Sequence, residues 1–247
     1  MTDLNIALVT GGTGGIGTAI CQRLANKGYK VIALSSSEEK ALKWSSEQAS
    51  LGYSIQARCL NVSDFDACTR TILDIEECEG PIDVLINAAG ITRDSTLKRM
   101  SLEKWQDVID INLTGTFNMC RNVIEFMLGR QYGRIINISS INGEKGQFGQ
   151  VNYAASKAGI HGITMSLAQE VASKGITVNT ISPGYIATDM VMAVDETIRN
   201  QIIAQIPVGR LGKPSEIAHV CDFLADKESA FITGANLSAN GGQNMHH

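Results

Sequence analysis

The sequence lacks both a basic run and a long apolar run. Its 21 Lys and Arg residues are outnumbered by 25 Asp and Glu residues, for a formal net charge of −4. No basic cluster is dense enough to follow a phosphate backbone, so we expect no nucleic-acid partner. No stretch approaches the roughly 20 apolar residues of a bilayer-spanning helix, so we expect no membrane partner. The chain enters a strand pattern at Ile6 without a basic, apolar or cleavable leader, which predicts a soluble cytoplasmic protein.

Metal-binding and domain-linking patterns are also missing. The six cysteines show no Cys-x-x-Cys and no Cys/His spacing, so we expect reduced structural thiols, with neither a disulfide framework nor a metal. Only four prolines occur in 247 residues, and no Ser/Gly/Pro-rich linker or repeat interrupts the chain. We therefore predict a single domain over residues 1–247.

What the sequence does have is an alternation of short β-branched runs with helical patterns. Strands are expected at 6–10, 31–35, 54–60, 84–87, 134–138, 177–182 and 235–238. Helices are expected at 15–27, 38–51, 64–77, 102–128, around Tyr153, and at 214–225. Apolar strands between helices predict a Rossmann-type α/β fold, a doubly wound parallel sheet with helices on both faces. The least regular part, about 183–207, is expected to be a mobile flap beside the site.

A glycine-rich segment joins the first expected strand to the first helix. It reads Thr-Gly-Gly-Thr-Gly-Gly-Ile-Gly over 10–17. Glycines allow a tight turn, and a pyrophosphate would lie over the helix N-terminus, where free N–H groups and the helix dipole favour an anion. Such a cluster also occurs as a plain turn, but its place between strand and helix predicts dinucleotide binding.

The end of the second expected strand indicates which dinucleotide is bound. An acid there would bond the 2′-hydroxyl of NAD and repel a 2′-phosphate. The chain instead reads Ser-Ser-Ser over 35–37, with Lys40 and Lys43 within about a turn. These residues favour NADP, although Glu38 and Glu39 weigh mildly toward NAD.

The stretch 137–159 brings a hydroxyl, a phenol and an ammonium into reach of one another. Tyr153 and Lys157 are four residues apart, so on a helix they share one face, where a fixed ammonium would stabilise a phenolate. Ser140 ends a strand-like run, and a Gly-rich loop would deliver its hydroxyl to the same point. A lone Tyr-x-x-x-Lys is usually an exposed pair on an ordinary helix, but these three groups can form a proton-transfer device.

Together, these motifs resemble the short-chain dehydrogenase/reductase family. The matching residues, in the family's order, are Thr10, Gly11, Gly15, Gly17, Asn61, Val62, the 87–90 Asn-Ala-Ala-Gly turn, Asn112, Ser140, Tyr153, Lys157, Pro183 and Gly184. By spacing alone, Asn112 reads as a satisfied helix amide and 87–90 as a common turn. The combination is specific although each part is not.

The resemblance implies an oxidoreductase with defined catalytic roles. Tyr153 would protonate the substrate carbonyl oxygen while NADPH delivers hydride to the carbon. Lys157 would lower the pKa of Tyr153 and bind the nicotinamide ribose, and Ser140 would hold the carbonyl. Asn112 would position a water that links Lys157 to solvent. NADPH would be bound by Gly11, Thr13, Gly14, Gly15, Ile16, Gly17, Ser35, Asn61, Val62, Asn87, Ala88, Ala89, Gly90, Tyr153, Lys157, Pro183, Gly184 and Ile186.

Within the family, residues 15–24, 89–94, 142–150 and 183–190 resemble reductases of 3-oxoacyl-CoA. This implies reduction of acetoacetyl-CoA to an (R)-3-hydroxyacyl-CoA for polyhydroxybutyrate synthesis, by a homotetramer. Substrate contacts would come from Asp94, Arg99, Ser140, Gln147, Phe148, Gln150, Tyr153, Gly184 and Tyr185.

Two alternatives stay open. A 3-oxoacyl-(acyl-carrier-protein) reductase would share the catalytic residues, and Arg93, Lys98 and Arg99 would offer its acidic carrier a basic patch. A catalytically inactive nucleotide-binding regulator would carry a broken Ser/Tyr/Lys set, whereas the set here is intact.

Overall fold

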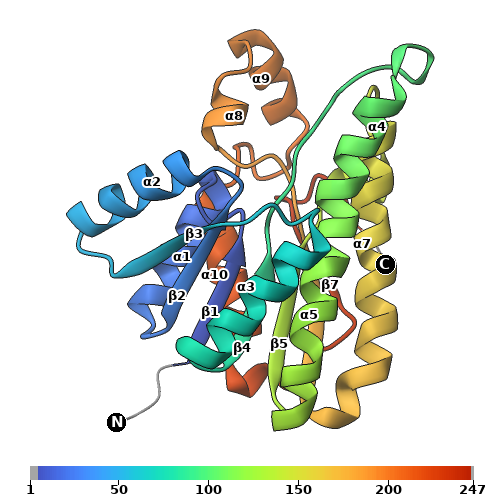
Figure 1. Cartoon of the computed structure of the whole chain (residues 1–247). Coiled ribbons are helices and arrows are strands. Elements are labelled where there is room, and N and C mark those ends of the chain that lie inside the picture. Colours follow the sequence, from blue (N-terminus) through green and yellow to red (C-terminus); the bar gives the residue numbers. More distant parts are fainter. Residues whose placement is uncertain (1–4, 246–247) are drawn as a thin grey trace.

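A sheet of seven parallel strands forms the centre of the computed structural model, which describes residues 5–245 (Figure 1). The strands are β1 (Ile6–Thr10), β2 (Lys30–Ser35), β3 (Ile55–Cys59), β4 (Ile82–Asn87), β5 (Gly133–Ile138), β6 (Ile176–Pro183) and β7 (Asn236–Ala239). Their order is β3-β2-β1-β4-β5-β6-β7. The doubly wound fold predicted from the sequence is therefore confirmed. The expectation about a leader concerns residues 1–4, which lie outside the described residues.

Helices cover both faces of the sheet. The longer ones are α1 (Gly15–Asn26), α2 (Glu38–Ser50), α3 (Phe65–Cys78), α4 (Leu102–Ile109), α5 (Gly115–Arg130), α7 (Val151–Val171), α9 (Glu196–Ala204) and α10 (Pro214–Ala225). Helices α1, α2 and α10 pack on one face, and α3, α5 and α7 on the other (Figure 1). Among the residues that the structure describes, none of these helices is long and apolar enough to cross a bilayer.

The two hydrophobic cores follow from alternation along the strands. In β1, Ile6 and Leu8 point into the core under α3, α5 and α7, whereas Ala7 and Val9 point into the core under α1 and α10. All four side chains are at most 1% exposed. A strand buried on both faces reads as a continuous apolar run, which is why β1 could be recognised from its sequence.

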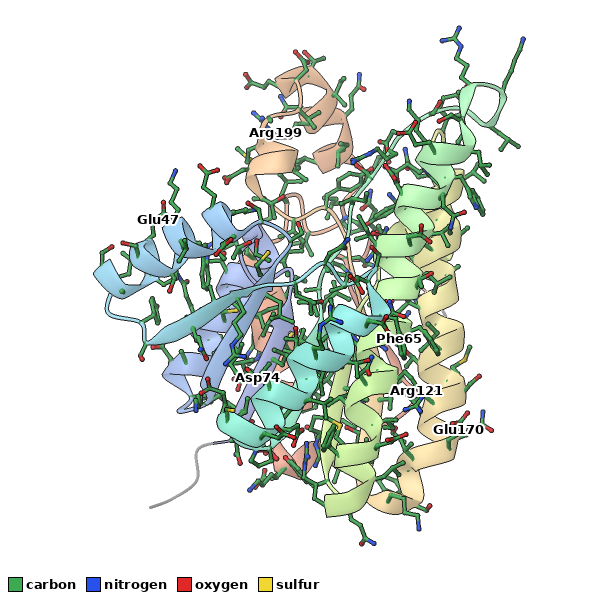
Figure 2. All side chains as sticks on the ribbon, in the orientation of Figure 1. Glu47, Phe65, Asp74, Arg121, Glu170 and Arg199 are labelled. Carbon is green, nitrogen blue, oxygen red and sulfur yellow. The ribbon has the colours of Figure 1, made fainter. Side chains whose placement is uncertain are left out.

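Side chains at the helix starts fix where several helices begin. The Ser37 hydroxyl accepts a hydrogen bond from Lys40 N at 3.3 Å at the start of α2, and the Asp64 carboxylate accepts one from Ala67 N at 2.9 Å at the start of α3. Such caps satisfy N–H groups that lack partners inside the helix. Side chains fill the space between these helices and the sheet, whereas Asp74 and Glu170 reach outward (Figure 2).

Three local expectations differ from the structure. The helix expected over 102–128 is interrupted by a π-helical turn, η2 (Asp110–Thr114), between α4 and α5. The Gly-rich loop expected after Ser140 contains a short helix, α6 (Ile141–Lys145). The irregular segment 183–207 contains α8 (Asp189–Met192) and α9, which stand at the top of Figure 1. Short helices leave too few periods in the sequence to be recognised.

Candidate active site

The candidate site lies at the carboxyl ends of the central strands. The order β2-β1-β4 means that the chain leaves β1 toward one side of the sheet and later continues on the other. The resulting crevice beyond the strand ends is where open α/β sheets bind their ligands. The glycine-rich segment follows β1, the Asn-Ala-Ala-Gly turn follows β4, and Ser140 follows β5.

The glycine-rich turn can hold its shape only with glycine. Gly11 has φ of +63°, and a Cβ there would lie 2.9 Å from the carbonyl oxygen of Ala88. A Cβ on Gly17 would lie 2.2 Å from the oxygen of Gly11. Helix α1 begins after Gly14 with no side chain capping its N-terminus, so its first N–H groups face outward. The turn over 11–17, called the glycine cradle below, is close-packed and carries no capping side chain, so it fits the pyrophosphate of a dinucleotide.

The turn after β4 is fastened to β1 through Thr10. The Thr10 hydroxyl accepts hydrogen bonds from the backbone N–H groups of Ala88 and Ala89, both at 3.1 Å. Asn87 turns its side chain into the sheet, where Nδ2 donates to Asn137 Oδ1 at 2.9 Å. Thr10 begins the glycine motif that the sequence showed, but its hydrogen bonds to the turn after β4 were not predicted, because they join strand ends that are far apart in the sequence.

Ser35 is in contact with the glycine-rich turn. Its side chain is buried and accepts a hydrogen bond from the Thr13 hydroxyl at 3.2 Å. It therefore ties the end of β2 to the glycine-rich turn. The neighbouring Ser36, Ser37 and Lys40 are exposed and are free to meet a ligand beyond the strand end.

Asn61 and Val62 occupy the next strand end. Asn61 is exposed and its Oδ1 accepts from Ser63 N at 3.2 Å, which closes the turn before α3. Val62 is buried against Gly115, where a Cβ would come within 2.6 Å of Val62 Cγ2. The structure thus places both at the carboxyl edge, as predicted.

Ser140 and Tyr153 are brought together at the end of β5. The Ser140 side chain caps α6 and accepts a hydrogen bond from Asn142 N at 3.1 Å. A side-chain hydrogen bond joins Ser140 to Tyr153, and it lowers the pKa of Tyr153 in part. Burial is the larger effect, and it raises the pKa of Tyr153 above its ordinary value.

Lys157 is buried and forms no ion pair with an acid among residues 5–245. Its Nζ donates to the backbone oxygen of Ile138 at 2.8 Å and lies 5.7 Å from the centre of the Tyr153 ring. Burial lowers the pKa of Lys157 from 10.5 to about 8. Burial therefore sets the direction of the Tyr153 pKa, and Lys157 is not among the groups that shift it here, so the lowering of that pKa by Lys157 stays a prediction.

Asn112 lies in the π-helical turn, buried against the turn after β4. Its Oδ1 accepts from Ile91 N at 2.8 Å, and its Nδ2 donates to Ile91 O at 3.0 Å and to Ser156 Oγ at 3.1 Å. A Cβ on Gly90 would lie 3.3 Å from Asn112 Oδ1 and 3.4 Å from Lys157 Nζ. Asn112 is thus beside Lys157, and both of its amide hydrogens are used within the protein.

Among the predicted substrate residues, a row of hydrogen-bonded side chains joins the loop after β4 to the loop after β6. Gln150 Nε2 donates to the Asp94 carboxylate at 3.0 Å, and Asn142 Nδ2 donates to Gln150 Oε1 at 2.9 Å. A further hydrogen bond joins Asn142 to Tyr185. Asn142 was not predicted, and its Oδ1 is buried without a partner among the described residues. It places an unused acceptor two residues after Ser140.

The other predicted substrate residues are not part of this row of hydrogen-bonded side chains. Arg99 lies in the exposed turn η1 (Leu97–Arg99), and Gln147 is exposed. Phe148 is 87% exposed. Gly184 follows β6, and a Cβ there would lie 2.9 Å from Asn240 Cα, so its glycine serves close backbone packing.

The segment after β6 reaches back to the cradle. Pro183 ends β6, and Ile186 is buried and bridges to Gly212. Thr188 lies against Gly15, where a Cβ would be 2.8 Å from Thr188 Cγ2. On α9, Arg199 Nη1 donates to the backbone oxygen of Met192 at 3.0 Å, joining α9 to the end of α8. Arg199 is labelled in Figure 2.

The fold and this arrangement define a class of protein. The family model of short chain dehydrogenases matches residues 5–199, and the chain belongs to this family of oxidoreductases. The acetoacetyl-CoA reductase of Cupriavidus necator is 55% identical over 242 residues, covering 97% of this chain and 98% of that protein. The 3-oxoacyl-[acyl-carrier-protein] reductase FabG of Vibrio cholerae is 46% identical over 240 residues, covering 97% of each. The crystal structure of gox2181 matches with a TM-score of 0.93 at 33% identity, over 98% of this chain and 96% of that one.

Proposed function

We propose that the protein reduces the 3-oxo group of acetoacetyl-CoA to an (R)-3-hydroxyacyl-CoA with NADPH, as a step of polyhydroxybutyrate synthesis. The observation that carries this proposal is the grouping of Ser140, Tyr153 and Lys157 beside a glycine cradle. The likeness to reductases of the same substrate over nearly the whole chain supports it.

Proton donation falls to Tyr153. A bound reduced nicotinamide supplies the hydride to the carbonyl carbon. Because burial raises the pKa of Tyr153, its phenol is protonated at neutral pH and ready to donate to the carbonyl oxygen. Ser140 accepts from Asn142 N and shares its own hydrogen with Tyr153, and we propose that this hydrogen turns to the substrate carbonyl oxygen and stabilises the charge that gathers there.

Lys157 is suited to returning the proton. With a pKa of about 8, its ammonium both carries and releases a proton near neutral pH. We propose that it also holds the nicotinamide ribose and that Asn112 fixes the 90–91 turn beside it. Since both amide hydrogens of Asn112 are used, we assign to Asn112 the shaping of the proton route, and a water there would use its remaining acceptor capacity.

The cofactor preference is proposed from the end of β2. Ser36, Ser37 and Lys40 are exposed there, with no acid at the strand end. Hydroxyl groups and an ammonium bind a 2′-phosphate, whereas an acid would repel it. We therefore favour NADP, held also by the backbone of 11–17 and 87–90 and by Ile186 near the nicotinamide end.

The substrate side is proposed to lie between Asp94, Gln150 and Tyr185. The hydrogen bonds through Asn142 give this wall a fixed shape. Arg99, Gln147 and Phe148 are exposed at the rim, where the CoA end would lie. We propose that 183–207 closes over this opening when both ligands are bound.

A carrier-protein substrate is the second candidate. Arg93, Lys98 and Arg99 are exposed beside an exposed Leu97, and this surface would suit an acidic carrier. The relative from Vibrio cholerae that is named for a carrier-protein substrate covers as much of the chain as the CoA-named one.

We also propose a homotetramer that acts in the cytoplasm, where nicotinamide and acyl-CoA pools meet. The helices on either side of β5 carry exposed apolar side chains, Phe117 on α5 at 48% and Met165 on α7 at 53%. Such residues are typical of interfaces between copies. Light scattering after size-exclusion chromatography tests this assembly, and a monomer contradicts it.

The proposed reaction is tested by following NADPH oxidation by the purified protein with acetoacetyl-CoA. The product is analysed for the configuration of its 3-hydroxyl group. Oxidation that depends on acetoacetyl-CoA and yields the (R)-alcohol is expected. Absence of NADPH oxidation both with acetoacetyl-CoA and with acetoacetyl-acyl-carrier-protein would show that the protein is not a 3-oxoacyl reductase.

A further inference from the structure

Behind the reactive groups, hydrogen bonds connect His161 to the backbone of Lys157. Both lie on α7, four residues apart, so they share one helix face. His161 Nε2 lies 2.8 Å from Ser139 Oγ, which donates to the backbone oxygen of Lys157 at 2.9 Å. The residue before Ser139 is Ile138, whose oxygen holds Lys157 Nζ. Two consecutive residues at the end of β5 therefore hold Lys157 at its backbone and at its ammonium.

The direction of these hydrogen bonds can be worked out from the groups involved. A hydroxyl has one hydrogen, and a backbone oxygen only accepts. Ser139 uses its hydrogen on Lys157, so it must accept from an N–H at His161 Nε2. This places a hydrogen on Nε2 of His161. Ser182 Oγ lies 3.3 Å from the same nitrogen and gives its own hydrogen to Asn236 at 2.8 Å.

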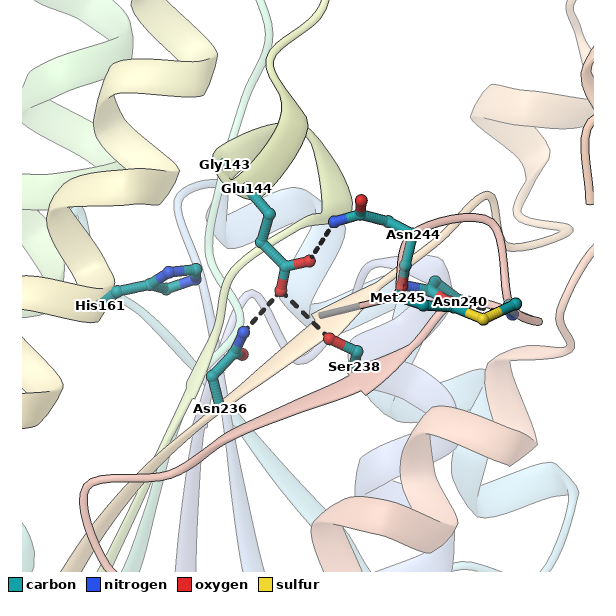
Figure 3. Close-up of a pocket in the computed structure, with 9 residues that line it drawn as sticks. Gly143, Glu144, His161, Asn236, Ser238, Asn240, Asn244 and Met245 are labelled. Atoms are coloured by element: carbon teal, nitrogen blue, oxygen red, sulfur yellow. Dashed lines mark hydrogen bonds between the residues drawn. The ribbon is translucent and has the colours of Figure 1, made fainter. Parts of the chain in front are cut away.

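The network continues to the helix that starts at Ser140. Asn236 Nδ2 donates to the Glu144 carboxylate on α6 (Figure 3). Glu144 also accepts from Ser238 at 3.3 Å and from Asn244 at 2.7 Å. The network thus links α7, which carries Tyr153 and Lys157, to α6, which is capped by Ser140.

His161 does not reach the reacting groups itself. It lines a cavity of about 810 Å³ with Glu144, Asn236 and Asn244, and Figure 3 shows its ring facing this carboxylate. None of Ser140, Tyr153 and Lys157 lines the cavity. An effect of His161 on the reaction therefore passes through its neighbours, and of these Ser139 is hydrogen-bonded to Lys157.

We propose that His161 is a positioning residue, which acts through Ser139 to hold the Lys157 turn of α7 against the end of β5. This inference rests on the proposed ketone reduction. Without the His161 hydrogen bond, the Ser139 hydroxyl turns away from the Lys157 carbonyl and α7 shifts relative to Ser140. A displacement of about 1 Å in a reacting group lowers the rate by up to about 100-fold.

The test compares His161→Leu, which removes the N–H donor, with His161→Gln, which keeps one at a similar reach. Ser139→Ala and the His161→Leu/Ser139→Ala double variant complete a cycle. Steady-state NADPH oxidation with acetoacetyl-CoA gives kcat and the KM for NADPH, and urea unfolding shows that each variant is folded. His219→Gln is the control, since His219 contacts Arg23 on α1, on the other face of the sheet.

A roughly tenfold loss of kcat is expected for His161→Leu and for Ser139→Ala, with an unchanged KM for NADPH. His161→Gln should keep kcat within about threefold, and the double variant should lose no more than either single one. Wild-type kcat in His161→Leu, or losses that multiply in the double variant, would overturn the inference. If His161→Leu does not fold, Ser139→Ala decides, and full activity in it overturns the inference. A wild-type protein without ketone reduction would instead refute the proposed function.

Discussion

The ammonium of Lys157 donates to the backbone carbonyl of Ile138 at 2.8 Å, which is its one hydrogen bond within residues 5–245. Lys157 is 4% exposed, and a buried ammonium without a carboxylate partner is held in its charged form at a cost. This cost explains why the pKa of Lys157 falls to about 8. It also makes the stability of the protein depend on pH in a defined direction.

The first prediction concerns stability in alkaline solution. Below about pH 8 the folded and unfolded chains both carry the Lys157 charge, so the burial penalty is fully present. Between about 8 and 10.5 the folded protein loses this proton first, so the penalty fades as pH rises. The shift corresponds to about 3 kcal/mol. Urea unfolding of wild type and Lys157→Met at pH 7.5 and pH 10 should show wild type gaining stability relative to the variant. A difference independent of pH would contradict the lowered pKa.

The second prediction concerns the proton donor. Tyr153→Phe removes the phenol oxygen and keeps the ring, so kcat should fall about 10²- to 10⁴-fold. NADPH affinity, measured by fluorescence titration, should change less than about threefold, because the glycine cradle is untouched. Tyr132→Phe is the matched control, since Tyr132 lies against Arg134 at the other end of β5. Turnover retained by Tyr153→Phe would remove Tyr153 from its role.

The third prediction concerns the choice of dinucleotide. Ser36 is exposed at the end of β2, so Ser36→Asp adds a charge without burying it. The carboxylate should repel a 2′-phosphate and lower kcat/KM for NADPH at least about tenfold, with no such loss for NADH. Ser50→Asp, on the exposed end of α2, controls for added charge. If the ratio of kcat/KM for NADPH to kcat/KM for NADH does not change, the 2′-phosphate does not bind at Ser36.

The fourth prediction concerns the glycine cradle. In Gly17→Ala the added Cβ would lie 2.2 Å from the backbone oxygen of Gly11, so the turn must move. A loss of more than about 2 kcal/mol of unfolding free energy is expected, with weaker NADPH binding. Gly129→Ala is the control, because a Cβ there meets nothing within 4 Å and should stabilise α5 by up to about 1 kcal/mol. Equal effects of the two substitutions would contradict this description of the turn.

The sequence predicted those features that depend on neighbours along the chain. The apolar strands, the glycine turn after β1 and the shared face of Tyr153 and Lys157 are all set by local spacing. The hydrogen bonds from the turn after β4 to Thr10, and those made by Asn142, were not predicted. They depend on which strand ends lie beside one another in the fold. The raised pKa of Tyr153 was not predicted for the same reason, since burial of Tyr153 is a property of the packed fold.

The π-helical turn around Asn112 shows a further limit. The periodicity of 102–128 is that of a helix throughout, and one inserted residue per turn leaves little trace in such a pattern. The structure shows that this turn brings the Asn112 amide to Ile91 and Ser156. Only the family resemblance drew attention to Asn112 from the sequence.

The most direct test of the proposed function is a comparison of kcat/KM for acetoacetyl-CoA and for acetoacetyl-acyl-carrier-protein. Both are measured by NADPH oxidation with the same wild-type protein at one ionic strength. The proposal predicts a higher kcat/KM for acetoacetyl-CoA. A higher value for the carrier-protein thioester would contradict it and establish the carrier-protein reductase in its place.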